Sequence, residues 1–219
     1  MNRFPAHLKK PDNTPMKTKK PRVPVHKHGP QIQRSHEVRI IGGLWKRTKL
    51  KVADKPGLRP TPDRVRETLF NWLGQDMRGL RCMDVFAGTG ALGFEAASRG
   101  AADVIVVEQD SALIEQLKAT QAQLEANQVH VLRGDGVASL RQATPASLHV
   151  IFIDPPFESA LYEPALAAAS RAVAVDGFVY LESPTAWNDA QLAPLGLAVH
   201  RYLKAGAVHA HVLTPTLAP

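Results

Sequence analysis

One stretch of this 219-residue chain decides its fold: Asp84-Val85-Phe86-Ala87-Gly88-Thr89-Gly90-Ala91-Leu92-Gly93. It follows an expected strand that begins at Arg81 and includes the apolar residues Cys82 and Met83, and it leads into a segment with helical spacing. It therefore joins a strand to a helix. Its glycines permit a tight turn and a close approach of the backbone to a bound group. The spacing Gly88-x-Gly90-x-x-Gly93 also satisfies the dinucleotide-binding fingerprint, although structural turns share that pattern. We therefore predict a loop that holds a nucleotide-type cofactor.

Strands and helices alternate on the C-terminal side of this loop. Strands are expected at 81–86, 103–108, 129–133, 148–153 and 177–183, and helices at 90–99, 111–126, 137–143 and 159–174. Such alternation predicts a parallel sheet with helices on both faces. The runs Leu197–Leu203 and Val208–Leu213 then favour a closing antiparallel hairpin. The predicted fold class is α/β, with a mostly parallel seven-stranded sheet and this C-terminal hairpin.

Acidic residues stand at the ends of the first three expected strands. In open α/β sheets ligands bind at the carboxyl edge, where such residues gather. Asp84 argues against a pyrophosphate on the following helix and favours a cationic, amino-acid-like part of a cofactor. Glu108 can accept both hydroxyls of a ribose. Asp135, between Gly134 and Gly136, is placed for an adenine amino group, although a plain turn is the alternative.

The fourth expected strand ends at Asp154-Pro155-Pro156-Phe157. Two prolines cannot continue a central strand, so the sheet stops there. The break leaves a carboxylate, a backbone carbonyl and an aromatic ring at the ligand-binding edge. Two acceptors beside a ring suit a planar base with an exocyclic amino group. From these four residues alone, a proline-stiffened surface turn is the alternative.

Positive charge is concentrated in the first quarter of the chain. Residues 1–51 hold 14 Lys and Arg against 2 Asp and Glu, a net charge of +12, whereas residues 52–219 carry −5. A basic segment ahead of a globular domain predicts contact with a polyanion, and a solubilising tail is the alternative. Residues 1–35 are rich in Pro, Lys and His, so we expect them to be disordered. Short apolar runs around Gly42-Gly43 predict a basic hairpin.

A further helix is expected after Thr61-Pro62-Asp63, where a hydroxyl can cap the helix, proline occupies the first turn and an acid follows. Gly74 is a plausible end of this helix. Arginines surround its start, at Arg59, Arg64 and Arg66. We predict that they contact phosphates, and a solvated surface is the alternative.

Several classes of protein are excluded or disfavoured. Cys82 is the one cysteine, so no internal disulfide can form, and its apolar flanks favour a buried, inert thiol. No run approaches the ~20 apolar residues that span a bilayer, and the prolines of the tail forbid the helix of a transit peptide. The pairs His26-x-His28 and His209-x-His211 lack further ligands at zinc spacing. We expect a cytoplasmic protein with no metal and no membrane contact.

Residues 39–183 resemble the bacterial methyltransferases that modify guanine N2 in small-subunit ribosomal RNA. The matching pieces are Arg39–Trp45, Leu58–Leu73, Asp84–Glu95 and Asp154–Phe157. Arg47 stands where the family often has glycine. The resemblance implies a Rossmann-like class I methyltransferase domain, which we expect at 59–219. It is preceded by the expected basic RNA-contact hairpin at 36–58 and by the tail at 1–35, which lies outside the resemblance. The resemblance also implies S-adenosylmethionine as donor and a monomer acting on assembled or partly assembled small ribosomal subunits.

The resemblance assigns roles to particular residues. The implied cofactor-binding residues are Asp84, Phe86, Ala87, Gly88, Thr89, Gly90, Glu108, Gln109, Asp135 and Gly136. The implied catalytic residues are Asp154, Pro155, Pro156 and Phe157, with the first two accepting hydrogens of the target amine and Phe157 stacking on a flipped-out base. The expected RNA-binding residues are Arg39, Trp45, Lys46, Arg47, Lys49, Arg59, Arg64 and Arg66. Trp45 could equally cap the core.

Three other functions agree less well with these residues. Methyltransferases that act on adenine N6 or cytosine N4 would also use Asp-Pro-Pro-aromatic, but the long match at 58–73 favours the guanine enzyme. A dinucleotide-dependent oxidoreductase would leave Asp154–Phe157 without a role. A non-catalytic ribosome-assembly factor would not need all four strand-end acids.

Overall fold

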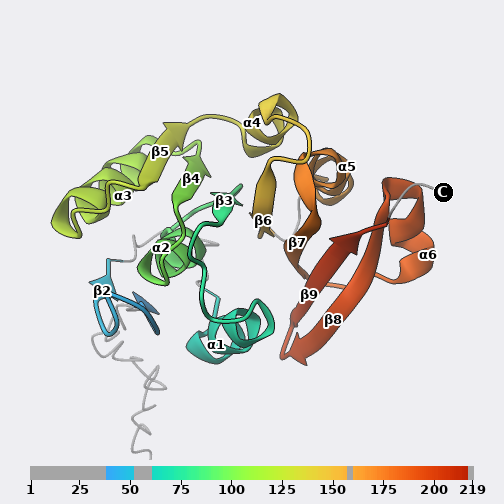
Figure 1. The fold of residues 1–219 in the computed structure, drawn as a ribbon, viewed down its shortest axis with the longest axis horizontal. Helices are drawn as coiled ribbons and strands as arrows, with labels where there is room; N and C mark the ends of the chain where they lie inside the picture. Colours follow the sequence, from blue (N-terminus) through green and yellow to red (C-terminus); the bar gives the residue numbers. More distant parts are fainter. Residues whose placement is uncertain (1–37, 52–60, 157–159, 217–219) are drawn as a thin grey trace, which may run out of the picture. The chain divides into compact units, whose positions relative to one another are not determined.

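The computed structural model describes residues 38–51, 61–156 and 160–216 (Figure 1). All of them belong to the compact unit Ser35–Pro219, one of two into which the chain divides. The tail predicted at 1–35 lies outside the described residues, and so do Arg59 and Phe157.

The helices and strands follow the alternation expected from the sequence. In chain order they are β1 (Val38–Arg39), β2 (Lys49–Leu50), α1 (Asp63–Trp72), β3 (Arg81–Asp84), α2 (Ala91–Ser98), β4 (Asp103–Glu108), α3 (Ser111–Gln123), β5 (Val129–Arg133), α4 (Gly136–Gln142), β6 (Leu148–Ile153), α5 (Tyr162–Ala172), β7 (Val173–Ser183), α6 (Asp189–Leu192), the 3₁₀ turn η1 (Ala193–Leu195), β8 (Leu197–Ala205) and β9 (Val208–Pro215). The predicted basic hairpin is confirmed as the antiparallel pair of β1 and β2.

The main sheet has seven strands in the order β5-β4-β3-β6-β7-β9-β8. Neighbouring strands from β5 to β7 pair in parallel, whereas β9 is antiparallel to β7 and β8. The predicted fold class, including the C-terminal antiparallel hairpin, is therefore confirmed. The chain moves outward from β3 to β5 and then returns to the other side of β3 with β6. The carboxyl ends of β3 and β6 thus meet at a topological switch point, where open α/β sheets bind ligands.

Two hydrophobic cores cover the two faces of the sheet. Residues of α1, α2 and α3 pack on one face, and residues of α4, α5 and α6 pack on the other (Figure 1). Side chains alternate between the faces along each strand. Phe152 of β6 and Tyr180 of β7 enter the first core, whereas Ile153 and Leu181 enter the second. By the same alternation, Asp154 follows Phe152 onto the α1–α3 side of the sheet edge.

The junction of α5 and β7 differs from the prediction. The helix expected over 159–174 ends at Ala172, and β7 begins immediately at Val173. Gly177, where we expected the strand to begin, lies inside β7. A Cβ atom there would come within 2.8 Å of the His149 carbonyl oxygen, so this glycine allows close approach of β6.

The predicted cap of α1 is also wrong. Pro62 occupies the N-cap position, and no side chain caps the helix. The Thr61 hydroxyl instead donates a hydrogen bond to Asp154 Oδ2 at 3.5 Å. The helix ends at Trp72, and Gly74 follows with a φ of +94°, as expected of a terminating glycine.

Two further expectations concern burial and membrane contact. Cys82 is 1% exposed, and burial raises the pKa of its thiol to about 12, which confirms a buried, inert cysteine. Among the described residues, no helix is both long enough and apolar enough to cross a bilayer.

Candidate active site

The glycine loop is held against a buried carboxylate. Asp84, at the end of β3, is 2% exposed, and its Oδ2 accepts a hydrogen bond from the Gly93 backbone N–H at 3.0 Å. Gly88 and Gly90 have φ values of +52° and +76°, which favour glycine. A Cβ atom at Gly90 would also lie 2.6 Å from a methyl group of Leu117. The loop geometry therefore requires these glycines, and it brings the N-terminus of α2 beside Asp84.

Other loop residues tie β3 to β4. The backbone N–H of Ala87 donates to the Val107 carbonyl at 2.9 Å. Ala87 and Thr89 are buried, and Phe86 is half-buried against the core of α4–α6. These contacts fix the loop between two strand ends.

Glu108 connects the end of β4 to the glycine loop. Its Oε2 accepts from the Gly88 backbone N–H at 3.0 Å. Its Oε1 accepts from the backbone N–H groups of Gln109 and Asp110 at 2.8 and 2.9 Å. The carboxylate is therefore held at the sheet edge, where carboxylate oxygens can also accept from ribose hydroxyls.

Asp135 and Gln109 are brought together from the ends of β5 and β4. Asp135 Oδ1 accepts from the Ala138 backbone N–H at 2.7 Å and caps α4, while its Oδ2 accepts from the Gln109 side-chain amide at 3.0 Å. A Cβ atom at Gly136 would come within 2.2 Å of the Val85 carbonyl oxygen, so this turn packs directly on the chain that leaves β3. The predicted cofactor residues thus gather along three adjacent strand ends.

The Asp-Pro-Pro segment leaves the sheet next to the glycine loop. Val85, just after β3, donates its backbone N–H to the Phe152 carbonyl of β6 at 3.0 Å. Asp154 is partly buried, Pro155 is buried and Pro156 is exposed. The two chain segments that carry the predicted cofactor and catalytic residues are therefore neighbours at one sheet edge.

Sequence reasoning missed a further buried acid, Glu182. It lies near the end of β7, one residue beyond the register pair Ile153–Leu181, and is therefore beside Asp154. Glu182 is 2% exposed, and its Oε1 accepts from the Tyr180 hydroxyl at 2.7 Å. A signal existed in the sequence, because Glu182 ends an apolar run shortly before Pro184, as Asp154 does before Pro155.

Burial dominates the electrostatics of these acids. It raises the pKa of Asp84 to about 7, with Glu108 and Glu182 adding to the increase. Burial also raises the pKa of Asp154 well above its usual range, and the negative charges of Glu182 and Asp84 add to the effect. The pKa of Glu182 is raised by burial as well. A cationic group in this place would relieve the repulsion, so the site suits a ligand with an ammonium or sulfonium centre.

A tyrosine hydroxyl on α5 completes this environment. The hydroxyl of Tyr162 is buried without a hydrogen-bond partner among the residues that the structure describes. Burial raises its pKa to about 12, and Asp154 and Glu182 contribute to the increase. Tyr162 therefore offers a free donor close to the predicted catalytic acid.

The predicted RNA-binding residues divide into exposed and buried sets. Arg39, Lys46, Arg47, Lys49 and Arg64 are exposed. Trp45 is half-buried and packs against the core, so the alternative of a core-capping tryptophan is supported.

The predicted phosphate contact of Arg66 is wrong. Its side chain is completely buried and pairs with Asp63 Oδ1 at 2.7 Å and with Glu95 Oε2 at 3.5 Å. Its Nε also donates to the Thr61 carbonyl at 3.3 Å. Arg66 is a structural residue, because it pairs with the buried Glu95 of α2. The local sequence of α1 does not reveal this partner.

The Glu95 carboxylate of α2 also binds the basic hairpin. Glu95 accepts from the backbone N–H groups of Ile41 and Gly42 at 2.7 and 2.8 Å, and from Arg99 Nε at 2.8 Å. A Cβ atom at Gly43 would lie 1.8 Å from the Ser98 carbonyl oxygen, so the hairpin loop rests directly on the end of α2. We call this set of contacts the hairpin clamp.

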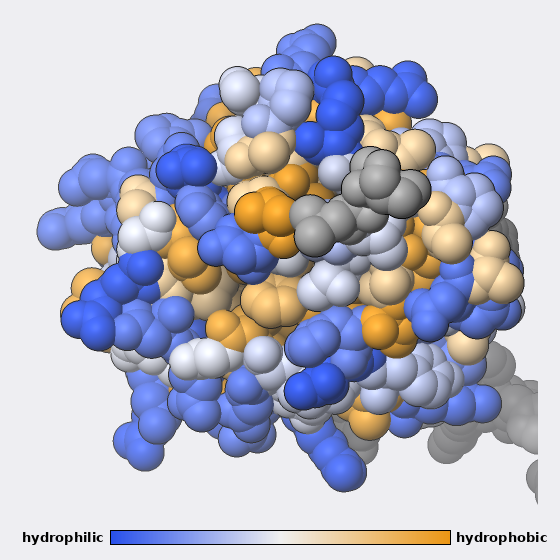
Figure 2. All heavy atoms as spheres, turned by 45° about the vertical axis from the view of Figure 1, so that its right-hand side comes forward, coloured by the Kyte–Doolittle hydropathy of each residue, from blue (hydrophilic) through white to orange (hydrophobic). Residues whose placement is uncertain are grey.

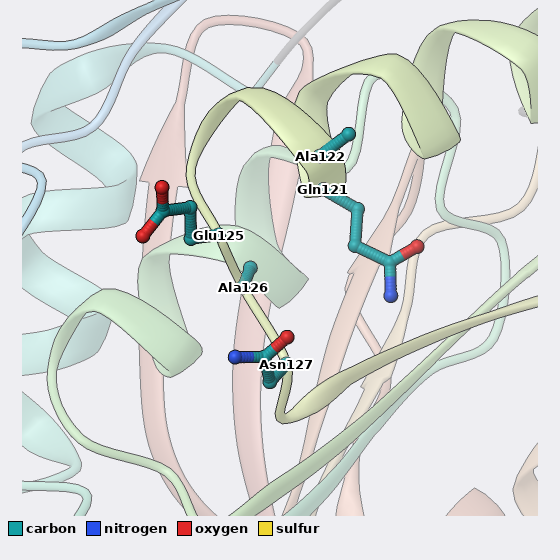
Figure 3. Close-up of a pocket in the computed structure, with 5 residues that line it drawn as sticks. All are labelled: Gln121, Ala122, Glu125, Ala126 and Asn127. Atoms are coloured by element: carbon teal, nitrogen blue, oxygen red, sulfur yellow. The ribbon is translucent and has the colours of Figure 1, made fainter.

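A separate hollow occurs at the other edge of the sheet (Figure 3). It has a volume of about 420 Å³ and lies at the turn between α3 and β5, before β5 begins. The lining residues are Gln121, Ala122, Glu125, Ala126 and Asn127, and Gln121 and Glu125 point to opposite sides (Figure 3). One carboxylate and two amides make no catalytic set, and the hollow is not connected with the predicted site.

Six strands of the sheet run in one direction and β9 runs in the other. Together with the glycine loop after β3 and Asp-Pro-Pro after β6, this sheet defines a Rossmann-like methyltransferase. A solved putative methyltransferase from Escherichia coli matches with a TM-score of 0.72 and 37% identity, covering 83% of this chain and 99% of that one. A putative methylase from Haemophilus influenzae matches with a TM-score of 0.67 and 31% identity over 83% and 99% of the two chains.

Sequence comparison narrows the class. The family model described as conserved hypothetical protein 95 matches residues 38–214. Ribosomal RNA small subunit methyltransferase D of Escherichia coli K12 is 42% identical over 182 residues, which cover 82% of this chain and 90% of the relative. The protein of the same name from Haemophilus influenzae is 45% identical over 60% of this chain and 69% of the relative. The chain belongs to this family.

Proposed function

We propose that the protein transfers a methyl group from S-adenosylmethionine to the exocyclic N2 of a guanine in small-subunit ribosomal RNA. The observation that carries the proposal is the adjacency of Asp154, after β6, and the Asp84–glycine loop, after β3. The name of the Escherichia coli relative, a ribosomal RNA small subunit methyltransferase that the chain matches over 90% of its length, supports the RNA substrate. As substrate we favour assembled or partly assembled subunits in the cytoplasm, with the protein acting as a monomer.

The residues present fit the proposed cofactor. Gly88 and Gly90 leave room for its amino-acid part beside Asp84, whose raised pKa reflects a buried carboxylate without a matching cation. Glu108 would hold the ribose, and Asp135 with Gly136 would hold the adenine. Phe86, Ala87, Thr89 and Gln109 would complete the set. S-adenosylmethionine supplies a methyl group on a positively charged sulfur, which makes it reactive towards a nitrogen lone pair.

Asp154 and Pro155 are proposed to prepare the amine. The lone pair of an exocyclic amine is delocalised into its ring, so the free amine is a poor nucleophile. Hydrogen bonds from its two hydrogens to the Asp154 carboxylate and the Pro155 carbonyl would favour a tetrahedral nitrogen. Accurate orientation of this kind can contribute roughly 7–11 kcal/mol to lowering a barrier.

The remaining catalytic steps concern the base and the proton. Pro156 stiffens the segment, and Phe157, which lies outside the described residues, is proposed to stack on the flipped-out base. After methylation the nitrogen is cationic and must lose one proton. Asp154 can accept it, because the raised pKa of its carboxyl makes it a stronger base than an exposed aspartate.

The exposed basic residues are proposed to hold the RNA backbone. Arg39, Lys46, Arg47, Lys49 and Arg64 lie on or near the hairpin that the clamp fixes to α2. Arg59, outside the described residues, belongs to the same proposal. Phosphate contacts would position the RNA, while the half-buried Trp45 could offer a ring edge to a base.

Methyl-labelled S-adenosylmethionine and undermethylated small subunits provide the test. The proposal predicts label on N2 of a guanine, located by mass spectrometry of nuclease fragments. Label on adenine N6 or cytosine N4 would replace the guanine assignment with the alternative amine chemistry. Free RNA and free nucleoside, run in parallel, should accept much less label than subunits.

A further inference from the structure

The C-terminal hairpin differs in charge from the domain that carries it. Residues 52–219 are net acidic, yet residues 190–219 contain no Asp or Glu at all. They contain Arg201, Lys204 and three histidines. The two strands β8 and β9 therefore carry cations and no acid of their own, and Asp189 meets β8 only near its start, where it accepts the Val199 backbone N–H at 2.8 Å.

Aromatic rings line one face of this hairpin. Register pairs Tyr202 with His211 and Lys204 with His209, so these four side chains share a face. The Tyr202 ring lies 5.9 Å from the His209 ring and 5.0 Å from the His211 ring, and its hydroxyl is 2.7 Å from His209 Nδ1. Tyr202 is nevertheless 45% exposed. We call Tyr202, Lys204 and His209 the hairpin platform.

The platform lies towards the edge of the sheet that holds the acids. His209 of β9 pairs with Ser183 of β7, the residue after Glu182. Figure 2, turned so that the right-hand side of Figure 1 comes forward, shows apolar surface interrupted by hydrophilic residues on this side of the molecule. His211 pairs with Leu181, so the platform lies on the α4–α6 side of this edge, whereas Asp154 lies on the α1–α3 side. A ligand that extends from Asp154 would therefore have to pass over the end of β7 to reach the platform.

Further rings connect the platform with the acids. The buried His211 accepts the Trp187 backbone N–H at its Nε2 at 3.1 Å. The Trp187 ring lies 6.4 Å from the Tyr162 ring. The negative charge of Asp154 contributes to the raised pKa of the Tyr162 hydroxyl. Two ring pairs, Tyr162–Trp187 and His211–Tyr202, joined by the hydrogen bond from the Trp187 backbone, therefore connect the surroundings of Asp154 with the exposed Tyr202.

We propose that the hairpin platform binds single-stranded RNA next to the target nucleotide. A base would stack on the Tyr202 ring, and Lys204, on the same face, would meet an adjacent phosphate. An exposed ring beside a cation, on strands that carry no acid, matches RNA better than it matches a protein surface of mixed charge. This inference rests on the proposed function and deepens it. It adds a second RNA contact near the C-terminal end of the chain, in addition to the basic N-terminal hairpin.

The test measures RNA affinity separately from catalysis. A fluorescein-labelled 12-nucleotide single-stranded RNA is titrated with the full-length protein and followed by anisotropy, without S-adenosylmethionine. Loss of one base stack predicts that Tyr202→Ala weakens binding about tenfold. Tyr202→Phe keeps the ring and should bind within about twofold of wild type. Lys204→Ala should lower the slope of log affinity against log salt by about one.

Matched measurements exclude trivial explanations. Val175, 69% exposed on β7, serves as the control, and Val175→Ala should leave affinity and slope unchanged. Thermal melting monitors the fold of every variant. In methyl transfer to small subunits, Tyr202→Ala should raise KM more than it lowers kcat.

The outcomes separate this inference from the proposed function. Wild-type affinity in Tyr202→Ala and an unchanged slope in Lys204→Ala would overturn the inference, even if methyl transfer to RNA is observed. No binding of the RNA by the wild-type protein at low salt would overturn it too. Loss of subunit binding with unchanged RNA affinity would assign the platform to a ribosomal protein and also contradict it. If Tyr202→Ala weakens RNA binding while no RNA is methylated, the platform stands and the enzymatic proposal fails.

Discussion

Asp84 and Glu182 are buried and Asp154 is partly buried, and all three acids stand at the ends of neighbouring strands. Burial raises the pKa of each by disfavouring the charged form, and for Asp84 and Asp154 the charges of neighbouring acids add to the increase. Such an arrangement is unfavourable for the free protein, and a cationic ligand would make it favourable. Perturbed carboxyl groups gathered in this way are characteristic of functional sites.

The raised pKa of Asp84 makes stability depend on pH. Because its pKa in the fold, about 7, exceeds the ordinary value of 3.8, its contribution to stability is complete below about pH 4 and is lost as pH rises through 7. Asp84→Asn removes this titration and can still accept from the Gly93 N–H. We compare the melting temperatures of the variant and the wild type without cofactor. The difference, variant minus wild type, should therefore increase from pH 5 to pH 8. Parallel pH profiles of the two proteins would contradict this prediction.

Glu182 should influence the pH at which the acid limb of the pH–rate profile falls, through its effect on the pKa of Asp154. Its negative charge raises the pKa of Asp154, so Glu182→Gln should lower that pKa and move the limb to lower pH. Glutamine preserves an acceptor for the Tyr180 hydroxyl. Initial rates between pH 5 and 9 provide the measurement, with Glu163→Gln on the exposed side of α5 as the control. A limb that stays in place, or moves upwards, is incompatible with this role.

Residue-level prediction succeeded where a local rule applied. Asp84, Glu108, Asp135 and Asp154 each follow an apolar strand, so their common edge could be predicted. Arg66 could not be assigned correctly, because its partner Glu95 belongs to another helix and local spacing gives no sign of it. The contact of Thr61 with Asp154 was missed for the same reason.

At the scale of elements, the hairpin clamp explains why a two-strand hairpin stays ordered. β1 and β2 pair over only two residues each, which is too little for stability in water. Glu95 on α2 compensates by accepting two backbone N–H groups of the hairpin loop and by pairing with Arg66 and Arg99. The same side chain thus joins the hairpin, α1 and α2.

Removal of Glu95 should be costly. Glu95→Ala would leave the buried Arg66 without one of its partners and two loop N–H groups without acceptors, and breaking a buried ion pair typically costs about 3–5 kcal/mol. A fall in melting temperature of about 10 °C is expected. Glu115→Ala, which removes an exposed acid of α3, is the matched control and should change it little. Equal melting temperatures for the two variants would show that the clamp is not needed for stability.

Element boundaries were predictable except where tertiary contacts decide them. The ends of β4, β5 and β6 agree with expectation because apolar runs and turn residues mark them. The start of β7 was missed because Val173 is drawn into the sheet by pairing with Leu148. Gly177, the expected first residue of the strand, lies inside it and allows a close approach to β6.

On the scale of the whole molecule, the regular alternation of strands and helices was enough to predict the α/β sheet. The C-terminal hairpin followed from its two apolar runs around Ala205-Gly206. The insertion of β9 between β7 and β8 could not be derived from such patterns, because strand order depends on long-range pairing.

The N-terminal tail should contribute to RNA affinity through charge. Residues 1–35 carry nine Lys and Arg against one acid. Deletion of these residues should weaken binding to small-subunit RNA and reduce the slope of log affinity against log salt by at least about two. Filter binding between 50 and 300 mM salt measures the slope, and thermal melting of the truncated protein controls for loss of fold. If the truncated and full-length proteins give equal slopes, the tail takes no part in RNA binding.

The central claim is that Asp154, at the end of β6, acts on an RNA amine beside the cofactor loop that follows β3. The most direct measurement compares wild type with Asp154→Ala in methyl transfer from labelled S-adenosylmethionine to undermethylated small subunits, together with cofactor affinity by calorimetry. We predict label on guanine N2 for wild type. For the variant we predict a fall in kcat of at least about 100-fold, with cofactor affinity within about threefold of wild type. Normal turnover in Asp154→Ala would contradict the account.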